Sequence, residues 1–178
     1  QDGAWAATRQ ALQLDPQADG PVLLALALSE EGVSAAEPLI AQHFQGTSSP
    51  ETRMAYARSL LSRQRYPEAA VQLKRLTSEH PHLHEPWLLL AKMQVQDGRL
   101  DGAETSLQHF MALADTATPG QSHQAGLTQA FLLQAHIAEK RQQYPQALAW
   151  LDRIPNQQEL LGAQLRRASI LVHQGQLA

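Results

Sequence analysis

Small residues recur at one position in four segments of the chain whose other apolar positions carry mainly leucine and aromatic side chains. In each segment the eighth residue is an alanine, and the apolar residues around it have the spacing of one helix face. An internal repeat of this kind determines the fold class, so we consider the repeat before any single motif. The segments begin at Pro50, His84, Thr128 and Leu161, and their eighth residues are Ala57, Ala91, Ala135 and Ala168.

A second run of the same kind follows the first and predicts a pair of helices. Counted from His84, Trp87 is at position 4, Gly98 at 15, Ala103 at 20 and Leu107 at 24. Small residues at positions 8 and 20 let two antiparallel helices approach closely, and the large residues fill the space around that contact. The pattern therefore predicts a helix, a short turn and a second helix, repeated with a period of 34 residues.

One unit is longer than the others. Trp87 and Phe131 occupy equivalent positions but lie 44 residues apart, about ten more than the period. The extra residues fall in a stretch rich in turn formers, 115–123, which we interpret as a longer loop or an extended helix start. An insertion in one unit of an array lies on one face and is functional in some proteins, whereas a tolerated surface loop is the simpler alternative.

The period and the residues at these positions resemble the tetratricopeptide repeat (TPR) family, whose signature combines 34 residues with Trp, Gly or Ala, Tyr, Ala, Phe and Pro. The resemblance implies an all-α fold, a right-handed α-solenoid of antiparallel helix pairs with about ten helices. We expect a single TPR array over 1–178 that begins and ends within a repeat. Its parts are 1–16 (second helix of a truncated repeat), 17–49 (irregular repeat), 50–83 and 84–117 (repeats), 118–127 (insertion), 128–160 (repeat) and 161–178 (first helix of a truncated repeat).

Composition excludes several other classes of protein. The net charge of -3, with scattered basic residues, argues against a nucleic-acid surface, and the longest apolar run is far shorter than a membrane span. The absence of cysteine excludes disulfides, thiolate metal sites and a cysteine nucleophile. No catalytic motif with a nucleophilic serine, a zinc-binding helix or a phosphate loop is present, so we predict no enzyme activity and no cofactor.

Three histidines alternate along one short segment, His80, His82 and His84, beside Glu79 and Glu85. Alternating imidazoles in an extended segment project to one side and could share a divalent metal. A solvated turn between repeats is the simpler interpretation, so these residues are only a weak metal candidate.

The family resemblance implies a binding surface on the concave groove, which the first helix of each repeat lines with positions 2, 5, 9, 12 and 13. Position 9 supplies a mostly cationic row and position 5 an apolar row, which together suit an extended or helical peptide with an acidic group or free carboxylate. The edges would carry Glu51, Glu85 and Val95. The candidate residues are Met54, Arg58, Leu88, Lys92, Leu132, His136, Glu139 and Lys140.

The kind of partner is less defined. Domains of this family that clamp a chaperone's C-terminal tail use asparagines at positions 6 and 9. This chain has a single asparagine, Asn156, in a turn, which argues against that kind of partner. The stretches 135–150 and 162–168 resemble bacterial outer-membrane TPR lipoproteins, which implies a periplasmic scaffold, including an adaptor for a C-terminal processing protease. Alternatives are a cytoplasmic location, a structural array that self-associates through open repeat ends, and an envelope scaffold for polysaccharide export.

Overall fold

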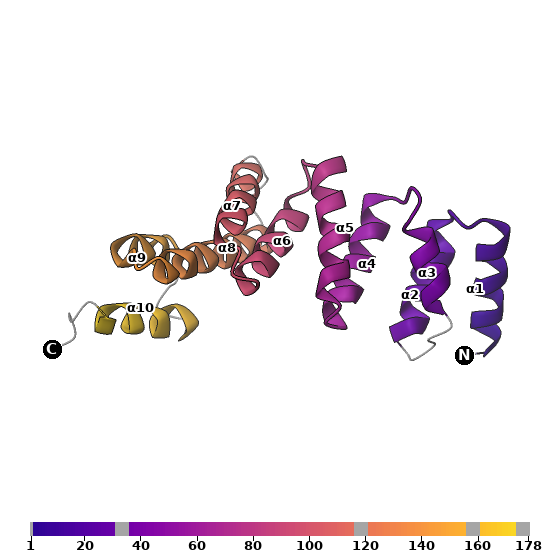
Figure 1. The fold of residues 1–178 in the computed structure, drawn as a ribbon, viewed down its shortest axis with the longest axis horizontal. Coiled ribbons are helices and arrows are strands. Elements are labelled where there is room, and N and C mark those ends of the chain that lie inside the picture. Colours follow the sequence, from indigo (N-terminus) through magenta and orange to yellow (C-terminus); the bar gives the residue numbers. More distant parts are fainter. Residues whose placement is uncertain (1, 31–35, 116–120, 156–160, 174–178) are drawn as a thin grey trace. The chain divides into compact units, whose positions relative to one another are not determined.

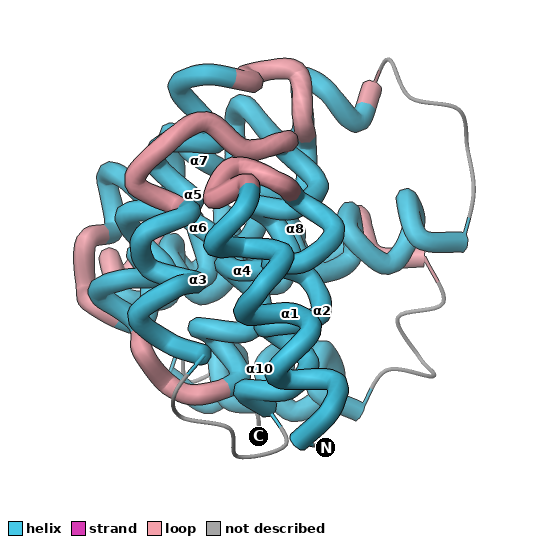
Figure 2. Tube along the Cα trace, turned by 90° about the vertical axis from the view of Figure 1, so that its right-hand side faces the viewer, coloured by secondary structure: helices cyan, strands magenta, loops and turns pink. Residues whose placement is uncertain are grey.

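The computed structural model describes residues 2–30, 36–115, 121–155 and 161–173, and in these ranges the chain forms ten α-helices and no strand. The predicted all-α, TPR-like fold class is confirmed. Figure 2 shows helices joined by loops throughout the described residues. The helices are α1 (Asp2–Leu14), α2 (Asp19–Glu30), α3 (Glu37–His43), α4 (Pro50–Ser62), α5 (Tyr66–Glu79), α6 (His84–Gln96), α7 (Leu100–Ala114), α8 (Gln121–Lys140), α9 (Tyr144–Asp152) and α10 (Leu161–His173).

The chain divides into two compact units, residues 1–81 and residues 82–178. In the first unit α1 packs on α2, α2 on α3 and α4, and α4 on α5. In the second unit α6 packs on α7, α8 on α6, α7 and α9, and α10 on α9. In the pairs α4–α5, α6–α7 and α8–α9 the first helix therefore contacts its own second helix and at least one helix of a neighbouring repeat.

Three helix pairs share the same turn. The turn's middle residue, position 15 of the repeat, has a positive φ: 60° at Gln64, 73° at Gly98 and 60° at Gln142. In each turn the N–H of position 16 donates to the carbonyl of position 11, and the N–H of position 15 donates to that of position 12. This is the Schellman arrangement, which ends a helix by satisfying its last carbonyl groups. The three turns therefore reverse the chain in the same way.

The alanines at the predicted contact are fully buried. Position 8 and position 20 of all three pairs have 0% exposure: Ala57, Ala91 and Ala135 on the first helices, and Ala69, Ala103 and Ala147 on the second. Any side chain larger than a methyl group at these positions would push the two helices apart. The predicted physical basis of the pairing is confirmed.

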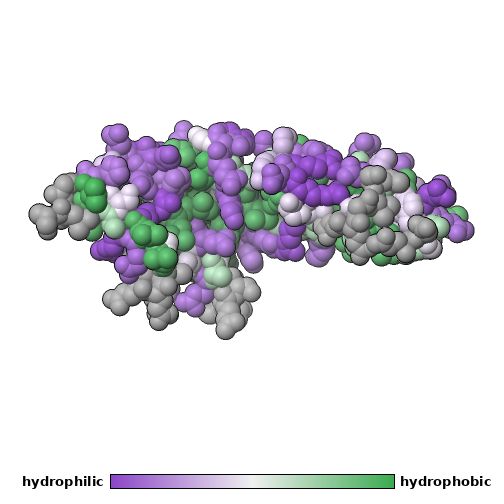
Figure 3. Space-filling view, turned by 90° about the horizontal axis from the view of Figure 1, so that it is seen from below, coloured by the Kyte–Doolittle hydropathy of each residue, from purple (hydrophilic) through white to green (hydrophobic). Residues whose placement is uncertain are grey.

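Helix α10 differs, because its position 8, Ala168, is exposed. Its buried residues are Ala163 and Ile170, at positions 3 and 10, which join the apolar cluster formed with α8 and α9. Leu165 and Val172 on the same helix are 62% and 61% exposed. In the part of the chain that the structure describes, α10 is thus covered on the side of the preceding repeat alone. Figure 3 shows that apolar patches lie among hydrophilic side chains on one face of the molecule.

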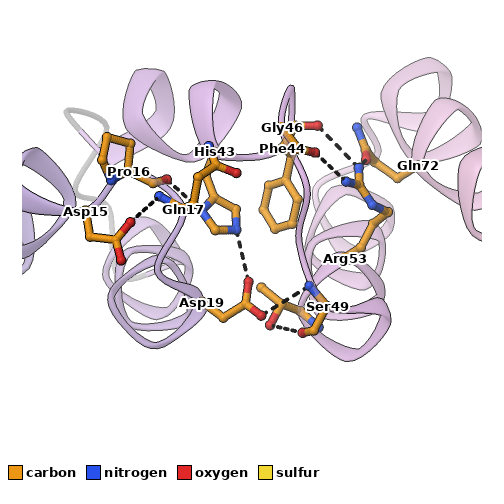
Figure 4. A network of polar contacts seen from close by, with 11 residues as sticks. Asp15, Pro16, Gln17, Asp19, His43, Phe44, Gly46, Ser49, Arg53 and Gln72 are labelled. Carbon is orange, nitrogen blue, oxygen red and sulfur yellow. Dashed lines mark hydrogen bonds and ion pairs between the residues drawn. The ribbon is translucent and has the colours of Figure 1, made fainter.

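The first unit contains a buried polar network (Figure 4). Arg53 on α4 is 1% exposed and donates to the carbonyl oxygens of Phe44 and Gly46, at 3.3 and 3.0 Å, and to Gln72 Oε1 on α5, at 2.7 Å. All three acceptors are neutral, and the guanidinium also lies over the Phe44 ring. Burial, together with the nearby charge of Arg75, lowers the pKa of Arg53. The hydrogen bonds of Arg53 hold the segment after α3 against the α4–α5 pair.

A second group of contacts in this network joins three helix ends. The His43 ring, 1% exposed, contacts the Pro16 carbonyl oxygen through Nδ1 at 3.0 Å and Asp19 Oδ1 through Nε2 at 3.2 Å. The other carboxylate oxygen of Asp19 accepts from the Ser49 N–H at 3.1 Å, and Ser49 caps α4. Burial alone would raise the pKa of Asp19, but hydrogen bonds from Ser49 and attraction to His43 outweigh it, so this pKa is lowered.

Helix α8 has 20 residues, whereas the first helices α4 and α6 have 13 each. Those two begin at position 1 of their repeats, as α10 does, but α8 begins seven residues before position 1, Thr128. Within the segment interpreted as an insertion, residues 118–120 lie outside the described residues. Residues 121–127 form about two additional helical turns. Of the two interpretations given above, this part is an extended helix start.

Candidate functional site

The second unit has two cavities on its first helices. Since each residue turns a helix by about 100°, positions 2, 5, 9, 12 and 13 lie within an arc of about 100°. The two cavities are bordered by such positions on α6 and α8. We call them the apolar cavity and the polar cavity.

The apolar cavity has a volume of about 430 Å³ and lies between α6, α7 and the beginning of α8. Its interior is formed by Leu88 and Phe110, which are 8% and 3% exposed and belong to the core cluster of α6, α7 and α8. The His84 ring lies edge-on to Phe110, with centroids 6.1 Å apart. The lining residues are His84, Glu85, Leu88, Phe110, Ala114, Ala125, Gly126 and Gln129.

The polar cavity has a volume of about 280 Å³ and lies where α8, the turn after it, α9 and α10 meet. Tyr144 stacks on His173 at one side, with centroids 6.0 Å apart. Lys140 is exposed and forms no ion pair with any residue that the structure describes. The lining residues are His136, Glu139, Lys140, Gln142, Tyr144 and His173.

Arg166 of α10 connects two residues of this cavity. Its Nη1 lies 2.7 Å from Glu139 Oε2 and 2.7 Å from His136 Nδ1. Because a guanidinium only donates hydrogen bonds, His136 Nδ1 accepts one and the ring proton is on Nε2. Burial, and then the charge of Arg166, lower the pKa of His136. The imidazole is therefore neutral near pH 7, and the cationic row expected at position 9 does not extend to it.

The other candidate groove residues occupy different surroundings. Met54 is buried, with 7% exposure, whereas Arg58 is exposed on the same helix in the first unit. Lys92 is exposed on α6, and Leu132 is half-buried against the cluster of α8, α9 and α10. The structure therefore brings together His136, Glu139 and Lys140 in the polar cavity and places Leu88 in the apolar one.

The three histidines proposed as a weak metal candidate are not brought together as a ligand set. His80 follows the last residue of α5 and belongs to the first unit, while His82 and His84 belong to the second. Among the described residues no group of three or more His, Cys, Asp or Glu side chains has a metal-binding arrangement. The side chain of His84 lies at the apolar cavity instead.

Several residues that line the cavities or contact their lining escaped the sequence analysis. Arg166, which contacts two lining residues, is at position 6 of its repeat. That position is one of those used by the chaperone-binding domains considered above, so it was a usable signal. Phe110 and Ala125 had none, because a second-helix aromatic residue predicts only core packing and Ala125 lies outside the periodic positions.

Antiparallel helix pairs with the same turn and the same buried alanines define a helical-repeat protein. Residues 50–93, which cover α4, α5 and most of α6, match the tetratricopeptide repeat family model. A comparison with curated proteins gave no match. Tetratricopeptide repeats generally mediate protein–protein interactions, and the family typically provides non-enzymatic scaffolds. No described helix combines the length and the apolar character needed to cross a lipid bilayer.

Proposed function

We propose that the chain is a non-enzymatic scaffold that binds an extended segment of a partner protein along the first helices of residues 82–178. The bound segment runs along α8 from the apolar cavity to the polar cavity. The observation that carries this proposal is that α8 borders both cavities with one face. Gln129 contributes to the first cavity, and His136, Glu139 and Lys140 to the second.

The distance between the cavities suits a short peptide. From Gln129 to Glu139 the helix rises about 15 Å at 1.5 Å per residue. An extended chain advances about 3.3 Å per residue, so about four or five residues of a peptide span this distance. A segment of that length fits both cavities at once.

The charges of the polar cavity favour an acidic group in the ligand. Glu139 is neutralised by Arg166, and His136 is neutral, so Lys140 supplies the uncompensated charge among these groups. Because Nδ1 of His136 accepts from Arg166, its Nε2–H is a donor. A carboxylate, from an acidic side chain or a chain end, is the matching acceptor for both groups.

Charge reversal at the polar cavity tests the proposal. Peptides that bind the chain are first selected from a displayed random decapeptide library, and their affinities are measured by fluorescence anisotropy. We expect Lys140→Glu to weaken a selected peptide that carries a carboxylate by about tenfold or more, since hydrogen bonds to charged groups contribute about 1.5–3 kcal/mol.

The matched control is Lys74→Glu, which reverses an exposed lysine on the second helix α5 and is expected to change affinity less than twofold. Titrations are made at concentrations where sedimentation velocity shows monomers, because Leu161, Leu165 and Val172 leave apolar surface on α10. Equal affinities for the wild type and Lys140→Glu would overturn the proposed site.

The particular partner is a further part of the proposal. The resemblance to envelope lipoproteins supports an adaptor for a periplasmic C-terminal processing protease, with a segment of the protease bound in the groove. A purified protease of this class is expected to bind the wild type and to bind Lys140→Glu about tenfold more weakly. If the protease binds the wild type and Lys140→Glu equally, the polar cavity is not the surface that binds it. If the protease binds neither protein, the proposed adaptor role is wrong.

A further inference from the structure

We propose that the apolar cavity is a pocket for a large apolar side chain, preferably aromatic, of the bound segment, and that a neighbouring basic residue of that segment faces Glu85. This inference rests on the proposed function and specifies the ligand. The added turns of α8, residues 121–127, supply one wall of the pocket. The pocket is thus a property of this chain's long repeat.

The wall is built by residues that the 34-residue period does not contain. Ala125 and Gly126 line the cavity, and both precede Thr128, the first position of the repeat. Helices α4 and α6 begin at that first position and have no corresponding residues. An array of regular repeats would therefore leave the outer side of Leu88 and Phe110 open.

The wall packs closely against the other two helices. A Cβ atom on Gly126 would lie 3.0 Å from Phe110 Cζ and 3.8 Å from Leu88 Cδ2, so a glycine permits this approach. Leu127, the next residue, packs against the apolar clusters on both sides of α8. The added turns are held by these contacts, and the pocket is formed before any ligand binds.

The lining determines what the pocket accepts. Leu88, Phe110, Ala114, Ala125 and Gly126 present carbon atoms, and the volume of about 430 Å³ is within the range of roughly 300–1,000 Å³ found for ligand pockets. A buried aromatic side chain contributes about 150–250 Å² of surface. An aromatic residue is therefore the best occupant.

The polar residues of the lining determine what lies beside that side chain. Glu85 carries the formal negative charge of the lining at pH 7, with histidine taken as neutral, so a lysine or arginine next to the aromatic residue is complementary to it. Gln129 has an amide that both donates and accepts, which suits a peptide backbone at the mouth. These groups fit a peptide better than an isolated hydrocarbon.

Capped dipeptides test the pocket directly. Acetyl-Phe-Lys-amide, acetyl-Phe-Glu-amide and acetyl-Ala-Lys-amide are titrated into the whole chain, and the backbone amide signals of Gly126 and Gln129 are followed by NMR. We expect the Phe-Lys peptide to bind about tenfold more tightly than Ala-Lys, from burial of the ring. It should bind about threefold more tightly than Phe-Glu, from the charge of Glu85.

Two substitutions separate the pocket from other surfaces. Ala125→Phe places a ring in the cavity and is expected to abolish the shifts, whereas Ala149→Phe, at an exposed alanine on α9 outside the lining, is expected to retain them. Glu85→Gln should make the Phe-Lys and Phe-Glu peptides bind equally, and this comparison holds even if Ala125→Phe fails to fold. Equal binding of Phe-Lys and Ala-Lys, or shifts that persist in folded Ala125→Phe, would overturn the pocket.

The outcome is distinguishable from failure of the proposed function. A library-selected peptide that requires Lys140 but binds Ala125→Phe normally overturns the pocket and leaves the scaffold function intact. The opposite result is also possible: dipeptides shift the Gly126 signal, but no selected peptide depends on Lys140. That result would support the pocket and overturn the proposed binding along α8.

Discussion

The two units of the chain differ in where their buried arginine and histidine side chains lie. In residues 1–81 charged and polar groups are buried between helices, and both the buried arginine and the buried histidine of the described residues lie there, Arg53 and His43. In residues 82–178 the charged groups named above, Glu85, Glu139 and Lys140, border the two cavities. Among the described residues, fully buried arginine and histidine side chains therefore occur in the first unit alone.

The difference follows from the regularity of the repeats. The segment after α3, residues 44–49, has no helix of its own, and its carbonyl groups need donors that Arg53 supplies. In the second unit the pairs α6–α7 and α8–α9 satisfy their own ends through the shared turn. In these two described turns the backbone hydrogen bonds are made between backbone groups alone.

Removing the buried arginine is the strongest way to break this comparison. Arg53→Ala leaves two carbonyl oxygens and the Gln72 amide without their donor and opens a cavity, and we expect a loss of about 3–5 kcal/mol of unfolding free energy. Urea unfolding followed by circular dichroism measures it. Lys74→Ala, at an exposed residue, is the control with an expected change below about 0.5 kcal/mol. A loss below about 1 kcal/mol for Arg53→Ala would mean that the network is dispensable.

A bulky residue at the helix contact tests the second unit. Ala91→Leu forces α6 and α7 apart at a fully buried position, and the expected loss is about 1–3 kcal/mol. Ala168→Leu is the matched control, because it makes the same change at the same repeat position on the exposed face of α10, where about 0.5 kcal/mol or less is expected. Equal losses for the two variants would show that the alanine contact does not set the packing.

The smallest expected effect is the dependence of the unfolding free energy on pH, to which His136 contributes in the second unit and Asp19 in the first. The lowered pKa of His136 means that the unfolded chain binds the proton more readily, so its contribution is present above about pH 6.5 and is lost as pH falls below that value. The expected loss is below about 1 kcal/mol, because the ring is partly solvated. Urea unfolding at pH 7.5 and pH 5.5 should show a smaller change for His136→Asn than for the wild type.

The corresponding group of the first unit titrates in a more acidic range. The pKa of Asp19 is lowered, so its stabilisation is present above about pH 4 and is lost as pH falls through the folded value. The loss of unfolding free energy between pH 5.5 and pH 3.5 should therefore be smaller for Asp19→Asn than for the wild type. An equal loss for the two proteins in that range would contradict this assignment.

Periodicity was sufficient to predict the helix pairs and the fold class. Alanine at positions 8 and 20 has one explanation in such a pattern, a close helix contact, and all six alanines of the three pairs are fully buried. The extra length between Trp87 and Phe131 was also visible, but its conformation was not. The turn formers of residues 115–123 left a loop and an extended helix start as alternatives, and nothing in the sequence indicated that Gly126 permits close packing against Phe110.

The candidate site was predictable only in part. The repeat register selected His136, Glu139 and Lys140, which line one cavity. It could not show that Arg166, 30 residues further along the chain, holds His136 in its neutral form. Such a contact depends on side-chain geometry between successive first helices, and a count of positions along one helix carries no information about it.

The shared turn at position 15 has a consequence for how such arrays acquire new surfaces. Because each turn fixes where the second helix starts, residues can be added in front of a first helix while its turn to the second helix stays the same. The start of α8 shows the result, two further turns of helix followed by a pair with the usual turn at Gln142. The N-terminal end of a first helix is therefore a position where residues can be added. Grafting the same seven residues before α4 is expected to lengthen that helix by about two turns, with the turn at Gln64 unchanged.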